Sequence, residues 1–175
     1  VASTVARIGF TGSATLETGS LTLEGPATIS TPSLRATLAW LGPDIGTGPI
    51  LGAAAVRGNA HWSGDTITIN DATVELDGNT ATGSVALAVG GQRPRLTAQV
   101  SAPHIDLTPY VEATRADFAA REPWILAAAH VPFADTLNAD ITLAAGQIIA
   151  GNLRLGDVSA KAGLADGAFS VALEK

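Results

Sequence analysis

The sequence contains neither cysteine nor methionine among its 175 residues. Without cysteine the chain can form no disulfide framework and no thiolate metal site. Without methionine it has no initiator. We therefore expect Val1 not to be a native start, and the chain to be a processed product or a piece of a longer protein.

Charge, aromatic residues and long apolar runs are also scarce. Charged residues make up 15% and aromatic residues 5% of the chain, against 46% hydrophobic residues. This balance excludes a disordered chain, which combines high charge with low hydrophobicity. The net charge of −6 argues against a nucleic-acid partner, because a phosphate backbone would repel it. The longest apolar run, Ile45–Val56, is shorter than the roughly 18 residues of a membrane helix and contains Pro49.

Alternation of apolar and polar residues with a period of two recurs along most of the chain. This pattern is typical of half-buried strands. The clearest apolar positions are Ile67, Ile69, Val74, Leu76, Val85, Leu87, Val89, Leu96, Ala98, Ile141, Leu143, Val171 and Leu173. Turn signals separate the runs, at Ser63-Gly64-Asp65, Asp77-Gly78-Asn79, Gly90-Gly91-Gln92, Gly156-Asp157 and Asp166-Gly167. Strands spaced by about 8–12 residues with such turns predict an antiparallel all-β architecture.

A short pattern of aliphatic, polar, aliphatic, turn, turn occurs three times. Its copies are 21–25, 67–71 and 153–157, reading LTLEG, ITIND and LRLGD. A repeated hairpin unit that stacks on its neighbours would explain it. Any meandering sheet would produce a similar pattern, so both interpretations stay open.

Helices interrupt the strands at one or two places. In the segment Pro32–Leu41, Thr31 can accept a bond from the first free amides and Pro32 suits the first helical position. Gly42 and Pro43 end this segment. A second helix is expected over about Leu107–Ala120, and residues 121–135 are expected to form a loop or linker.

We therefore predict a mainly β fold, an antiparallel curved sheet of repeated hairpins with one or two short helices. The whole chain, 1–175, is expected to form one β-rich domain. A division into 1–107 and 124–175, joined by 108–123, is the alternative.

Residues that could carry chemistry are sparse. His61, His104 and His130 are far apart, and His104 with Asp106 fits a solvated pair better than half a metal site. The remaining candidates are better explained by loops, turns and packing: Gly46, Gly48, Gly52, Asp65, Asp71, Asp77, Asn79, Trp40, Trp62 and Trp124. We predict no catalytic residues, no cofactor and no metal, and hence no enzyme.

Several stretches, taken in order, resemble the AsmA family of Gram-negative envelope proteins. They are TPSLRATLAWLG at 31–42, ITINDATVELDGNTATGSVALAVGGQRP at 67–94, Ile105-Asp106-Leu107, and NADITL at 138–143 with the strands that follow it. Each piece is unspecific alone, but their order and spacing cover nearly the whole chain. The chain is similar to the C-terminal region of such proteins.

The resemblance implies a function but no site residues. Family members have an N-terminal inner-membrane helix and a β-rich periplasmic body. They are implicated in outer-membrane assembly, and the larger ones are thought to move phospholipid along an apolar groove. The resemblance thus implies a periplasmic module, anchored to the inner membrane through a helix absent here, whose partners are phospholipid acyl chains and neighbouring β repeats.

Two functional classes follow from this interpretation. The first is a lipid-transfer or envelope-biogenesis module. Its candidate groove lining is Ile67, Ile69, Val74, Leu76, Val85, Leu87 and Val89, which lie on consecutive predicted strands. An ordinary core covered by the helix 32–41 would also explain these residues. The second class is a structural or protein-interaction module, acting in protein targeting or insertion at the outer membrane by strand addition at an open sheet edge.

Overall fold

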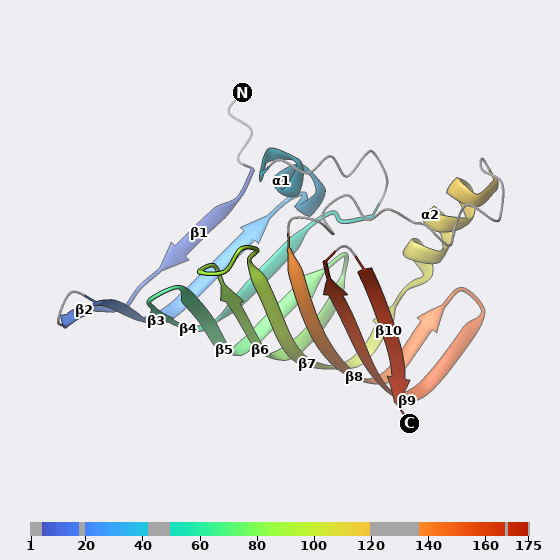
Figure 1. Cartoon of the computed structure of the whole chain (residues 1–175). Helices are drawn as coiled ribbons and strands as arrows, with labels where there is room; N and C mark the ends of the chain where they lie inside the picture. The colour runs from blue at the N-terminus through green and yellow to red at the C-terminus, as the bar shows by residue number, and fades with distance from the viewer. Residues whose placement is uncertain (1–4, 18–19, 42–49, 120–136, 167, 175) are drawn as a thin grey trace.

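The described part of the chain forms one curved, ten-stranded sheet with two short helices (Figure 1). A computed structural model describes residues 5–17, 20–41, 50–119, 137–166 and 168–174. The elements are β1 (Arg7–Phe10), β2 (Ser13–Glu17), β3 (Ser20–Thr31), α1 (Leu34–Leu41), β4 (Ala54–Ser63), β5 (Thr66–Leu76), β6 (Asn79–Ala88), β7 (Arg95–Asp106), α2 (Thr108–Ala119), β8 (Asn138–Ala150), β9 (Leu153–Ala165) and β10 (Ala168–Glu174). The predicted mainly β fold is confirmed.

Neighbouring strands follow the chain order from β3 to β10, and β1 and β2 both pair with β3. All of these pairs are antiparallel except β7–β8, which is parallel. A parallel pair needs a connection that returns the chain to the starting end of the sheet. Here α2 begins that connection, so the strands before and after it belong to one sheet.

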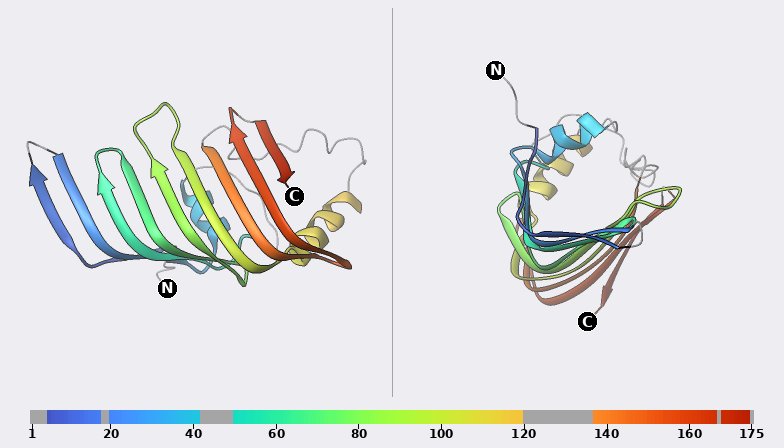
Figure 2. Two further views of the ribbon diagram at one scale, coloured as in Figure 1. Left: turned by 90° about the horizontal axis from the view of Figure 1, so that it is seen from below. Right: turned by 90° about the vertical axis from the view of Figure 1, so that its left-hand side faces the viewer.

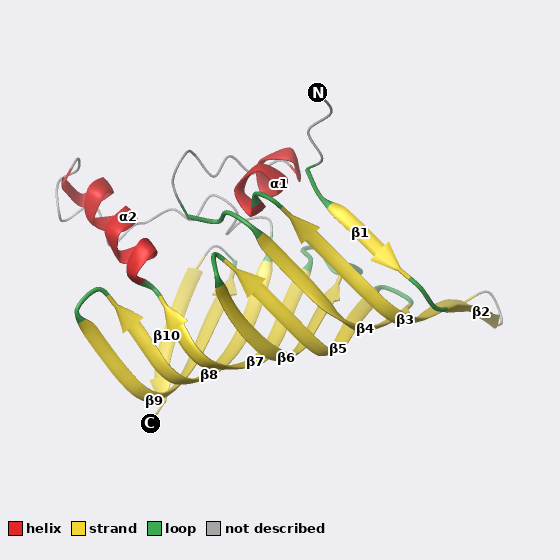
Figure 3. Ribbon diagram, turned by 180° about the vertical axis from the view of Figure 1, so that it is seen from behind, coloured by secondary structure: helices red, strands yellow, loops and turns green. Residues whose placement is uncertain are grey.

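The strands curl so that the sheet becomes an open trough. Figure 2 shows this shape end-on, with α1 and α2 along the same rim. Figure 3 shows the two helices from behind, again at the same side of the sheet. We call this side the helix rim. The opposite, hairpin rim contains the β4–β5 turn and the segment between β6 and β7.

The repeated five-residue pattern marks bends inside strands rather than turns between them. Gly25, Asp71 and Asp157 end its three copies and lie within β3, β5 and β9, with φ of 150°, 50° and 48°. The prediction of a turn at Gly156-Asp157 is therefore wrong. Glycine and aspartate tolerate positive φ within a strand as they do in turns. Of the three positions only Asp71 lies at a shift of register, and such an irregularity bends a strand without ending it.

The helices begin close to their predicted starts. In α1 the Ser33 hydroxyl accepts a bond from the Ala36 amide at 3.1 Å, so Ser33 is the cap and the helix starts later than Pro32. The Thr31 hydroxyl accepts instead from the Ser33 amide, at 3.1 Å. At the start of α2 the Asp106 carboxylate accepts a bond from the Thr108 amide at 2.8 Å. The helix runs from Thr108 to Ala119, so the predicted second helix is confirmed to within a residue at each end. Most of the expected loop 121–135 lies outside the described residues.

A candidate apolar trough

One face of the sheet, which we call the inner face, carries apolar residues in rows that cross the strands. Residues directly opposite each other on paired strands point to the same side. Two rows therefore follow from the register, one through Trp62, Ile67, Leu87, Leu96, Ala139 and Leu164, and one through Ala60, Ile69, Val85, Ala98, Ile141 and Ala162. Each row contains only apolar residues over six consecutive strands.

The inner face is buried by curvature rather than by a second layer. Ile69 is 6% and Ala98 9% exposed. In the described part of the chain both helices lie at the helix rim and no element is stacked over these rows (Figure 2). Side chains that converge on the concave side shield one another, which explains the low exposure. No large side chain among the described residues is fully buried, as a closed core would require.

Six of the seven candidate groove residues share this face. Ile67, Ile69, Val85 and Leu87 lie in the two rows. Val74 and Leu76 lie opposite Ala81 and Asn79, further along β5. Strict alternation would place Val74 on the other face from Ile69. One extra residue at the bend between Ile69 and Ala72 restores the parity.

Val89 is the exception among the candidates. It follows Ala88, the last residue of β6, and is 50% exposed. Its amide donates to the Asp65 carbonyl at 2.8 Å, across the hairpin rim. Val89 therefore lies past the end of β6, at the hairpin rim and outside the two rows.

Small residues dominate the deepest positions of the inner face. Among the described residues, seven of the ten buried hydrophobic residues are alanines, for example Ala72 at 0% and Ala145 at 4% exposure. Leucine or isoleucine at these positions would fill the concavity. Because these side chains are small and apolar, the inner face offers apolar contact but few functional groups.

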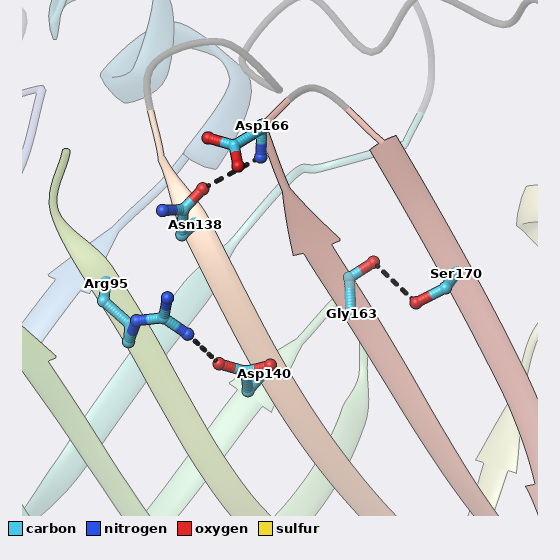
Figure 4. A network of polar contacts seen from close by, with 6 residues as sticks. All are labelled: Arg95, Asn138, Asp140, Gly163, Asp166 and Ser170. Atoms are coloured by element: carbon cyan, nitrogen blue, oxygen red, sulfur yellow. Dashed lines mark hydrogen bonds and ion pairs between the residues drawn. The ribbon is translucent and has the colours of Figure 1, made fainter.

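The outer face is polar and its charges pair across strands. Arg57 on β4 pairs with Glu75 on β5. Arg95 donates to Asp140 at 2.5 Å, from β7 to β8 (Figure 4). These side chains are roughly half exposed, so each pair contributes little to stability. Polar Thr68 and Thr97 lie opposite Ala86 on this face.

A polar junction at the helix rim joins three segments. Asp77, in the β5–β6 turn, accepts bonds from the Leu51 and Gly52 amides at 2.9 and 2.7 Å. It also accepts a bond from the Tyr110 hydroxyl of α2 at 2.5 Å. Asp77 was predicted only as a turn residue. Its role in the junction depends on partners distant in sequence, and the Asp-Gly pair alone does not reveal them.

Ionisation at the junction follows from these contacts. Burial raises the pKa of the Asp77 carboxyl, but the bonds from Tyr110, Gly52 and Leu51 outweigh it and hold the pKa below its usual range. Burial and the same carboxylate raise the pKa of Tyr110 well above its ordinary value. Asp77 is therefore a carboxylate and Tyr110 a neutral donor at neutral pH.

The remaining chemical candidates that lie in the described part of the chain form no site. His61 and His104 are exposed on β4 and β7, while His130 and Trp124 lie outside the described residues. Hydrogen bonds from Thr108 lower the pKa of the Asp106 carboxyl, which caps α2. Across the described ranges no group of three or more His, Cys, Asp or Glu could hold a metal ion. No described helix is long and apolar enough to cross a membrane.

Comparison with known proteins does not extend this account. No family model, no curated protein and no solved structure matches the chain. The apolar trough is thus the candidate functional site on its geometry alone.

Proposed function

We propose that this chain is a non-enzymatic lipid-handling module whose inner face holds phospholipid acyl chains. In the full-length protein it acts in the periplasm, anchored to the inner membrane, in outer-membrane assembly and phospholipid transfer. The location and the process come from the resemblance to AsmA proteins. The mode of binding comes from the trough.

One observation supports the proposal above the others. Apolar rows run unbroken across six strands, and among the described elements nothing is stacked over them. Strands lie about 4.8 Å apart, so six strands span roughly 24 Å, which is comparable with an extended acyl chain. The residues of these rows are buried or half-buried, apart from Trp62 at 41% exposure, so the concave face is continuously apolar without a second layer of described elements, and an apolar ligand such as an acyl chain fits such a face.

Neighbouring β repeats would lengthen the path. The strands β1 and β2 form one edge of the sheet, where Ile8 is 77% and Leu16 71% exposed. A repeat paired at this edge would continue the inner face. Acyl chains could then move along the rows without entering water.

The test places a charge inside the trough and, for comparison, on its outside. Leu87→Asp introduces a carboxylate into the first apolar row. Ala86→Asp introduces the same group one residue away on the outer face. Burying an unpaired charge beside an acyl chain is costly, so only Leu87→Asp should lose ligand. Mass spectrometry of the purified chains measures the co-purifying phospholipid, and circular dichroism verifies the fold.

In the full-length protein the same pair is scored by envelope permeability to detergents and by protein level. Leu87→Asp at normal level with a leaky envelope supports the proposal. An intact envelope, or equal phospholipid content in both folded variants, contradicts it. The alternative, a protein-interaction module, predicts no phospholipid in either variant or in the unaltered chain.

A further inference from the structure

The edge strand β10 lacks the features that usually prevent an edge strand from pairing with another chain. Among the described residues β10 pairs only with β9, and its register runs from Ala168 to Glu174 without a shift. Its inner-face residues Val171 and Leu173 are 56% and 68% exposed. Natural edge strands are normally protected by charge, proline, bulges or short length. No charge, proline or bulge occurs between Ala168 and Leu173.

The opposite edge is different. It is divided into β1 and β2, of four and five residues, which pair with successive parts of β3. The division interrupts the line of free backbone groups. A long, regular partner strand therefore fits β10 better than it fits β1 or β2.

We propose that a second copy of this chain pairs with β10, antiparallel and about a two-fold axis at Val171. In this register Val171 lies opposite Val171 of the second copy, and Phe169 lies opposite Leu173 of the second copy. It is the only two-fold register that pairs all residues from Ala168 to Glu174. Apolar positions then meet apolar positions, and cross-strand pairs of this kind stabilise a sheet.

The two-fold register also keeps the like charges of the two strands apart. The two-fold register places Glu174 opposite Ala168 of the second copy, so the acidic residues do not meet. A closed two-fold dimer covers the β10 edges of both copies at once. Pairing of β10 with a different edge of the next copy would instead generate an open filament. The axis is perpendicular to the sheet, so the two inner faces lie on the same side and the trough continues from one copy into the other.

The absence of cysteine makes a direct test possible, because one introduced thiol is the only thiol in the chain. Val171→Cys places the two sulfurs across the axis, within the Cα separation of about 4.4–6.8 Å that a disulfide allows. Leu173→Cys is the matched control on the same face. Its two copies are displaced by four residues along the strands, about 14 Å, and cannot bridge.

We expect the unaltered chain to be a dimer by light scattering at tens of micromolar. Mild oxidation should convert most of Val171→Cys, and little of Leu173→Cys, into a covalent dimer. Leu173→Lys should be monomeric with an unchanged circular dichroism spectrum, because the side chain it replaces is 68% exposed. A monomeric unaltered chain, higher oligomers, or equal cross-linking of both cysteine variants would overturn the proposal. The phospholipid content of Leu173→Lys reports separately on lipid binding.

Discussion

At the scale of single residues, backbone conformation and one carboxylate fix the shape of the trough. Gly83 in β6 has a φ of 157° and lies opposite Val100. A Cβ at this position would collide with the carbonyl oxygen of Gln99 on β7. Glycine is therefore required here by both conformation and space.

Gly83→Ala should destabilise the fold by about 2 kcal/mol or more, since it adds backbone strain to a steric collision. The free energy of unfolding in urea measures the effect. Gly9→Ala is the control, because a Cβ there meets nothing within 4 Å. Equal stability of the two variants would show that the bend in β6 relaxes freely.

Asp77 should make part of the stability depend on pH. Its folded pKa lies below that of the unfolded chain, about 3.9, so its contribution is present above that pH and is lost as the pH falls through the folded value. Asp77→Asn should cost about 1.5–3 kcal/mol at pH 7, the usual value of hydrogen bonds to a charged group. The difference from the unaltered chain should shrink at pH 3. Urea unfolding at both pH values tests this, and a difference independent of pH would contradict it.

Leu87→Ala distinguishes an open trough from a closed core. Leu87 is half-buried, so we expect its truncation to cost about 1 kcal/mol, less than the roughly 2–5 kcal/mol of a closed core. Urea unfolding measures the loss. A value within the closed-core range would mean that another layer covers the inner face in solution.

At the scale of elements, the strands are long because irregularities bend them instead of ending them. Asp71 holds a φ of 50° inside β5, which costs a residue with a Cβ about 1–2 kcal/mol. Asp71→Gly should thus preserve or raise stability. Asp71→Val should lower it by more than 1 kcal/mol, because a β-branched side chain suits positive φ worst. Thermal unfolding of the pair tests this, and the reverse order would contradict a left-handed bend.

Features of the fold that depend on neighbouring residues can be predicted from the sequence, whereas contacts between distant segments cannot. Alternation placed Ile67, Ile69, Val85 and Leu87 on one face, because the period of a strand is local. The residues around Asp71 and Asp157 predict turns where the structure has bends, because positive φ selects the same residues in both settings. The parallel pairing of β7 with β8 and the contact of Tyr110 with Asp77 join distant segments, and no local pattern encodes them.

At the scale of the whole molecule, the sheet exposes apolar surface while remaining regularly paired. We expect the folded protein to enhance the fluorescence of anilinonaphthalene sulfonate, a behaviour otherwise typical of molten globules, while still unfolding cooperatively. Oleate should displace the dye. A phospholipid at a hundred times its dissociation constant should stabilise the fold by about 2.7 kcal/mol. Absence of dye binding by the folded chain would contradict an accessible trough.

The parallel pair β7–β8 also has a consequence for the order of assembly. From β3 to β7, and again from β8 to β10, each strand pairs with the one made just before it. The join between the two groups brings Arg95 beside Asn138, 43 positions later in the chain (138 − 95). During synthesis the earlier hairpins can form one after another as they emerge. The later strands can also pair with one another, but they join the earlier group only when β8 pairs with β7. This pairing closes the long connection between the two groups, so it is the step at which loop-closure entropy slows folding most.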